Sequence, residues 1–109
     1  MTYEEIYSMI SDIGIPCAYY QFPDNSGQQP PFICFYYPRS DDFEADDKNY
    51  QRINELTIEL YTDAKDFDLE DAVTAALEAK GLVWSWDETE IESERMHLTT
   101  FYTEVIINA

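Results

Sequence analysis

The chain has 109 residues, 45% of them hydrophobic, and carries 23 acidic against 6 basic residues, a formal charge of −17. This length suits one domain with a packed core and leaves no room for a second. The negative charge argues against binding of free nucleic acid, which needs Lys and Arg to neutralise phosphates, and against an anionic membrane surface. Solubility alone also explains such a charge.

The N-terminal sequence is acidic where a secretory signal is basic, and no stretch approaches the roughly 18 apolar residues that span a bilayer. We therefore expect synthesis in the cytosol and no membrane partner. In that compartment Cys17 and Cys34 should be reduced thiols. Both lie in apolar, strand-like segments, where free cysteine behaves as a small buried hydrophobe.

An amphipathic helix is predicted close to the N-terminus. Thr2 and Glu5 have the spacing of a capping box, in which the hydroxyl accepts from one backbone amide and the carboxylate from another. One helical stripe of apolar residues follows: Ile6, Met9, Ile10 and Ile13. Gly14 supplies the left-handed residue that ends a helix, and Pro16 prevents the helix from resuming.

Two aromatic strands are predicted next, over residues 17–22 and 32–37, separated by a Pro-rich surface loop at 23–31. The second strand is apolar in both of its alternating positions. A strand of this kind is covered on both faces, so we expect helices on one face and a neighbouring subunit on the other.

An acidic segment over residues 40–48 is predicted to be a mobile, charged excursion. From Tyr50 a long strand follows, in which Leu56, Ile58 and Leu60 alternate with polar residues, as in a half-buried antiparallel sheet. The polar partners in this alternation are Glu55, Thr57 and Glu59.

The second helix is predicted to begin at Asp66 or Asp68 and to end at Gly81. Its apolar stripe consists of Leu69, Ala72, Val73, Ala76 and Leu77. Two terminal strands follow, over 82–91 and 97–107, with a turn at 92–95. The chain is thus predicted to be one α+β domain over residues 1–109: a largely antiparallel mixed β-sheet of four to five strands with two α-helices packed on one face, in the order α-β-β-β-α-β-β.

The sequence predicts no catalytic residue, no cofactor and no metal site. The single histidine, His97, has no nucleophile nearby in the sequence, and we interpret it as a surface or interface residue. The acidic segment fails as an EF-hand loop, because Asp46 and Arg52 stand where glycine and a bidentate glutamate are required. A solvated acidic loop with at most a weak cation site is the preferred interpretation, and we do not expect an enzyme.

A second acidic run precedes the last strand, with Glu88, Glu90 and Glu92 on one face of the predicted strand. Like charges in a row repel one another and are tolerated when solvated. They would also let an anionic polymer pass without sticking. The aromatic residues indicate a contact surface instead. Two helices cover only one face of the sheet, and the cores of protein interfaces are rich in aromatic side chains.

Three segments of the sequence resemble the tail terminators, or tail-completion proteins, of long-tailed bacteriophages and prophages. The first comprises residues 15–22 and 31–38, which flank the Pro-rich loop. The second runs from 40–46 into 50–61, and the third is 91–96 leading into the last strand. The resemblance is one of segment pattern over essentially the whole chain, and it includes no catalytic motif.

The resemblance implies a homo-oligomeric ring, commonly a hexamer, that caps the tail tube, ends its polymerisation and joins it to the head–tail connector. The protein would then lie in the tail or neck of the virion, with the bacterial cytoplasm as its place of assembly. DNA would only pass through the ring, without sequence-specific binding. The implied contact surfaces are the loops and the sheet edge, which correspond here to residues 23–31 and 39–49. The candidate interface residues in these loops are Pro23, Pro30, Pro31, Arg39, Asp41, Asp42, Phe43, Glu44, Asp46 and Asp47.

Other interpretations remain open at this level. The chain could be another neck component, such as a head-completion or joining protein. It could also be an acidic inhibitor that imitates DNA and occupies a basic cleft. An enzyme using the acidic loop and a metal ion is the weakest alternative.

Overall fold

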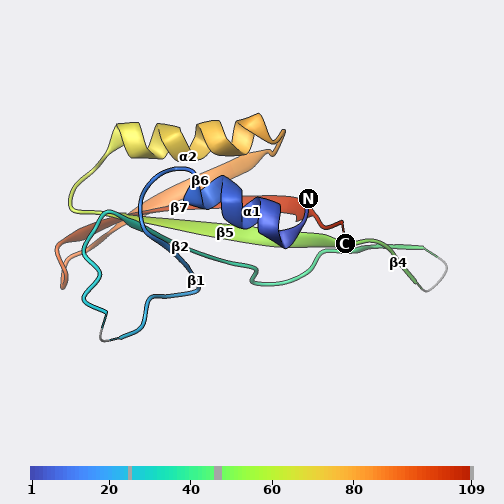
Figure 1. Cartoon of the computed structure of the whole chain (residues 1–109), viewed down its shortest axis with the longest axis horizontal. Helices are drawn as coiled ribbons and strands as arrows, with labels where there is room; N and C mark the ends of the chain where they lie inside the picture. Colours follow the sequence, from blue (N-terminus) through green and yellow to red (C-terminus); the bar gives the residue numbers. More distant parts are fainter. Residues whose placement is uncertain (25, 46–47, 109) are drawn as a thin grey trace.

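The protein forms a five-stranded sheet with both helices on one face, and a separate two-stranded hairpin (Figure 1). The structure, a computed structural model, describes residues 1–24, 26–45 and 48–108. Its elements are α1 (Tyr3–Ser11), β1 (Cys17–Tyr19), β2 (Phe32–Tyr36), β3 (Phe43–Ala45), β4 (Lys48–Gln51), β5 (Ile53–Thr62), α2 (Phe67–Ala79), β6 (Trp84–Ile91) and β7 (Met96–Ile106). The sheet order β1-β2-β5-β7-β6 confirms the predicted α+β class and helix placement.

The sheet is mixed, because β1 pairs in parallel with β2 while the other neighbours are antiparallel. Strands β5 and β7 form its centre and pair along ten consecutive residues, from Ile53↔Ile106 to Thr62↔His97. Their alternation sends Leu56, Ile58 and Leu60 of β5 into the core beneath the helices. The predicted half-buried pattern of this strand is therefore confirmed.

Both helices have the predicted caps. The Thr2 hydroxyl accepts from the Glu5 amide at 3.1 Å, and the Glu5 carboxylate accepts from the Thr2 amide at 3.2 Å, which completes the capping box. Asp66 accepts from the Leu69 amide at 3.0 Å at the start of α2. These bonds satisfy amides that have no partner inside the helix.

The helices bury their apolar stripes against one face of the sheet. The buried helical residues are Ile6, Met9, Ile10, Val73 and Leu77. They pack on sheet residues that are also buried: Ile33, Phe35, Leu56, Ile58, Leu60, Phe101 and Val105. Among the described residues, no helix is long and apolar enough to cross a bilayer.

The predicted acidic excursion is in part a β-hairpin. Strands β3 and β4 pair antiparallel and extend past the end of the main sheet (Figure 1). At the hairpin's base the Asp41 amide donates to the Ile53 carbonyl at 2.7 Å, and the Asp42 carboxylate accepts from the Ile53 amide at 2.9 Å. The backbone bond belongs to an antiparallel bridge between Ser40 and Asn54, which continues the pairing with β5 beyond the end of β2. Asp46 and Asp47 lie outside the described residues.

The first predicted strand is shorter than its apolar pattern indicates. It ends at Tyr19, because Tyr20 has a left-handed backbone with φ 69°. The Tyr20 amide still donates to the Phe35 carbonyl at 2.8 Å, and the chain then turns away from β2. The segment that follows crosses to the face of the sheet opposite the helices (Figure 1).

Candidate partner-binding surfaces

The face of the sheet without helices, called here the open face, carries aromatic rings at the end nearest the Pro-rich loop. The register places Phe32, Cys34 and Tyr36 of β2 on this face, opposite Tyr61, Glu59 and Thr57 of β5. The Phe32 and Tyr61 rings are stacked with centroids 4.8 Å apart. The expected aromatic face without helical cover is therefore present.

The chain segment after β1 folds over these rings and borders an open pocket of about 610 Å³, called here the aromatic pocket. Tyr20 packs on Tyr36 with ring centroids 5.4 Å apart, and Phe22 meets Phe32 edge-on at the same distance. The left-handed backbone of Tyr20 is rare for a bulky side chain and costs on the order of 1–3 kcal/mol. The surrounding packing holds this conformation and thereby positions a ring at the pocket.

Glu59 lies in the aromatic pocket and is half-buried. The Tyr61 hydroxyl donates to Glu59 Oε1 at 3.2 Å. Burial raises the pKa of Glu59, because a carboxylate loses hydration among the rings. Burial and the neighbouring Glu59 charge likewise raise the pKa of Tyr61.

The rim of the aromatic pocket adds negative charge. Asp24 and Glu94 also line it, whereas none of its described lining residues is Lys or Arg. Pro23 belongs to the same rim, so the structure places one of the predicted loop residues at this site. Pro30 and Pro31 lie at the other end of the loop, directly before β2.

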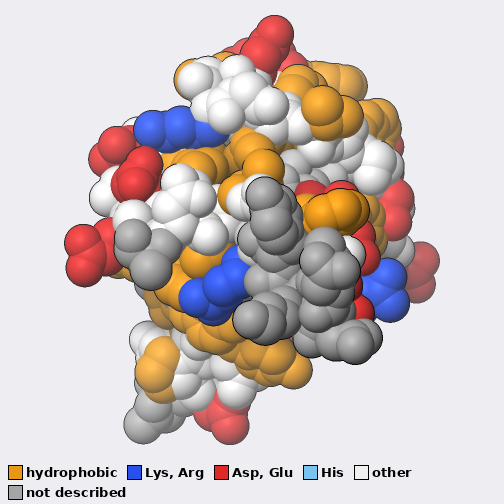
Figure 2. All heavy atoms as spheres, turned by 90° about the vertical axis from the view of Figure 1, so that its right-hand side faces the viewer, with side chains coloured by type: hydrophobic (Ala, Val, Ile, Leu, Met, Phe, Trp, Pro, Cys, Tyr) orange, Lys and Arg blue, Asp and Glu red, His pale blue; other side chains and the backbone are white. Residues whose placement is uncertain are grey.

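The hairpin is the second predicted contact region, and it lies at the opposite end of β2 from the Pro-rich loop (Figure 1). Arg39 at its base forms an ion pair with Glu55 of β5. Phe43 is 56% exposed, and Glu44 beside it is also exposed. This end of the molecule displays hydrophobic side chains with acidic and a few basic groups among them (Figure 2).

Carboxyl groups crowd together next to Arg39. Glu55 and Glu104 are directly opposite each other on β5 and β7. The pKa of Glu104 is raised, first by a hydrogen bond with the Asp41 carboxyl group and further by the charges of Asp41 and Glu55. Within the described part of the chain, no group of three or more potential ligands is arranged to hold a metal ion.

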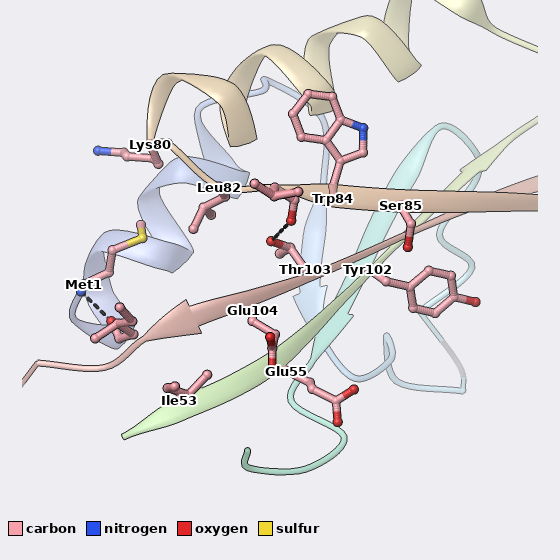
Figure 3. Close-up of a pocket in the computed structure, with 13 residues that line it drawn as sticks. Met1, Ile53, Glu55, Lys80, Leu82, Trp84, Ser85, Tyr102, Thr103 and Glu104 are labelled. Atoms are coloured by element: carbon pink, nitrogen blue, oxygen red, sulfur yellow. Dashed lines mark hydrogen bonds between the residues drawn. The ribbon is translucent and has the colours of Figure 1, made fainter. Parts of the chain in front are cut away.

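A larger pocket of about 820 Å³ opens where β6 begins (Figure 3). Trp84 pairs with Thr103, so the last three residues of β7 extend past the start of β6. The Thr103 hydroxyl donates to the Val83 carbonyl at 2.7 Å, and the N-terminal amine of Met1 donates to the Ile106 carbonyl at 2.6 Å. Trp84 and Tyr102 point to opposite faces of the sheet, so the pocket wraps around its edge (Figure 3).

His97 is buried, which contradicts its interpretation as a surface or interface residue. Its exposed fraction is 3%, because the register of β7 turns it toward the helix-covered face together with Thr99 and Phe101. His97 Nδ1 lies 2.5 Å from Glu90 Oε1, and Nε2 lies 3.0 Å from Glu88 Oε1. The second contact brings the imidazole and the carboxylate together but is not aligned as a hydrogen bond.

The acidic run of β6 is therefore partly neutralised by this chain itself. Lys65 contacts Glu88 at 3.0 Å and Glu70 at 2.8 Å, and the Thr99 hydroxyl donates to Glu70 at 3.2 Å. Only Glu92 of the predicted face falls outside the strand, in the turn at 92–95. The sequence could not reveal this network, since Lys65 and His97 are distant from each other in the chain.

Comparisons with known proteins establish the fold. No protein-family model matches the sequence, and a search of curated proteins gives no match. Among solved structures, the chain is similar to one from the virion of a native gene transfer agent (GTA) particle. The match has a TM-score of 0.66 at 13% identity and covers 95% of this chain and 92% of the other. The two chains share a fold over nearly their whole lengths.

Proposed function

We propose that this protein is a structural subunit of a phage-like virion. The observation that carries the proposal is the fold shared with a chain of a GTA virion over nearly the full length of both proteins. The resemblance of three sequence segments to phage tail terminators points the same way. A structural role also suits a small chain that presents several exposed aromatic side chains.

Within the virion we propose the role of tail terminator. Copies of the chain would close into a hexameric ring on the end of the tail tube, stop its polymerisation and form the junction with the head–tail connector. A ring uses a heterologous interface, in which two different surfaces of the subunit meet. The hairpin and the open face are two such different surfaces, at different positions on the fold.

The acidic surface supports this role without being specific to it. A channel lined by carboxylates would repel DNA phosphates and let DNA slide through the ring. Of the acidic groups on β6, Asp87 faces the open side of the sheet, whereas Glu88 and Glu90 contact Lys65 and His97. The exposed acids Glu92 and Glu94 of the turn and Glu44 of the hairpin are the better candidates for a channel lining.

The proposal is tested by assembling tail tube protein with and without this chain and imaging the tubes by electron microscopy. We expect tubes of limited length with a ring at one end. Phe43→Ser on the hairpin should reduce capping, whereas Phe67→Ser, which changes another exposed phenylalanine, on α2, should leave it intact. Tubes of unlimited length with no bound protein would contradict the proposal, and decoration of the connector alone would favour a different neck component.

A further inference from the structure

The aromatic pocket has the chemistry of a receptor for a cation. Its floor is a half-buried carboxylate, Glu59, and its walls include the rings of Tyr20, Tyr36 and Tyr61. The faces of aromatic rings attract cations, and a carboxylate nearby adds charge–charge attraction. Glu59 accepts one hydrogen bond, from Tyr61, whereas a carboxylate offers about four acceptor positions.

The pocket's charge is not balanced from within the described chain. Glu59, Glu94 and Asp24 line it, and none of the described lining residues is basic. Partial burial raises the pKa of Glu59, which means that the ionised form is incompletely solvated. A cation that entered the pocket would relieve this cost and would find the rings already in place.

Arginine fits this arrangement better than lysine does. The planar guanidinium group stacks on aromatic faces and donates several hydrogen bonds to a carboxylate in a fixed geometry. It is also weakly hydrated, so less solvation is lost on entry. A volume of about 610 Å³ is ample for one such side chain.

A second copy of this chain is a poor source of that arginine. Each copy offers only three arginine residues beside its 23 acidic ones. Arg39 is paired with Glu55, and Arg52 donates to the Tyr3 hydroxyl at 3.2 Å. Arg95 stands in the turn between two lining residues, Glu94 and Met96, and does not itself line the pocket.

We propose that the aromatic pocket binds an arginine side chain presented by a basic protein partner, with the guanidinium group on Glu59 and stacked against the tyrosine rings. The inference does not require a ring or a tail. Loss of tube capping would leave it standing, and failure of arginine binding would leave the terminator proposal standing.

The test uses the whole protein, labelled with ¹⁵N, and two short peptides as probes. One is acetyl-Ala-Arg-Ala-amide, and the other carries citrulline, a neutral analogue of arginine of nearly the same shape. We expect the arginine peptide to shift the amide resonances of the pocket residues in a saturable titration. The citrulline peptide should bind at least about tenfold more weakly than the arginine peptide, because it lacks the charge that Glu59 recognises.

Glu59→Gln should lower the affinity for the arginine peptide to that for the citrulline peptide. Glu104→Gln is the matched control, because it makes the same substitution on the same face of the sheet outside the pocket. Tyr36→Leu should weaken binding severalfold through loss of a ring face. Shifts spread evenly over the acidic surface, equal binding of both peptides, or equal affinity of the two glutamine variants would overturn the proposal.

Discussion

The two faces of the central sheet are built from the same strands but bury side chains of different kinds. Beneath the helices, Ile33 and Phe35 of β2 meet Leu60 and Ile58 of β5 in a continuous hydrophobic core. On the open face the same two strands bring together aromatic rings, hydroxyl groups and the Glu59 carboxylate. The helix-covered face supplies the hydrophobic core, whereas the open face has the composition of a partner-binding surface.

The burial of individual residues sharpens this contrast. Thr57, although on the open face, is buried at 5% exposure, and Glu59 is half-buried. Tyr20 and Phe22 fold back over neighbouring positions, so a face without helices is still partly covered. The cover is local and leaves the aromatic pocket open, which is why that pocket and not the whole face is the candidate site.

The largest predicted effect is a difference in stability between variants of two neighbouring residues of β7. Phe101→Ala should lower the free energy of unfolding by about 3–5 kcal/mol, because Phe101 is buried beneath the helices. Tyr102→Ala, on the open face with 41% exposure, should cost less than about 1 kcal/mol. Urea denaturation of both variants measures the difference, and similar costs would mean that the open face contributes to the core as much as the covered face does.

A smaller effect is expected at the polar margin of the covered face. His97→Leu should cost about 1–3 kcal/mol, because it keeps the volume but removes the partner of Glu90 and Glu88. Glu90→Gln retains a hydrogen-bond acceptor and should cost much less. Thermal denaturation of the two variants measures this difference. Unchanged stability of His97→Leu would show that the network holds no structural role.

The smallest effect concerns the pH dependence caused by Glu59. Because burial raises its pKa in the folded state, the native protein retains the Glu59 proton to higher pH than the unfolded chain does. Its contribution to stability is therefore fully present below the unfolded pKa and is lost as pH rises through the raised value.

Glu59→Gln should remove this slope and stabilise the protein at neutral pH by less than about 1 kcal/mol, since solvent reaches the group. Comparing unfolding of the variant and the wild type between pH 4 and pH 7 isolates the effect from the repulsion among the other acids. A wild-type curve parallel to that of the variant would show that Glu59 is well solvated in the folded state.

The elements that could be predicted from sequence are those with local causes. Thr2, Glu5 and Asp66 cap their helices through bonds to residues three positions away, so the signal lies within one turn. The alternation of Leu56, Ile58 and Leu60 likewise indicates which residues of β5 face the core. The turn at 92–95 also lies where it was predicted.

The candidate site could be predicted only in part. The sequence indicated an aromatic face without helical cover and a contact loop beginning at Pro23, and both belong to the aromatic pocket. The alternation of β5 placed Glu59 among the polar residues of the strand and gave no sign that it is half-buried. The missing information was that Tyr20 ends β1 and folds the next segment over β5, a contact between residues far apart in the chain.

By itself, then, the sequence determined the helices, the order of the main-sheet strands, the α+β class and the net charge. Capping, periodicity and composition act over a few residues or over the whole chain at once. The tertiary structure decided which acids find partners and which do not. His97 and Lys65 meet Glu88 across the helix-covered side, whereas Glu59 is left among rings with no cation lining its pocket within the described residues. Register and strand order determine these contacts, because a one-residue shift in the register of a strand would turn each of its side chains to the other face of the sheet.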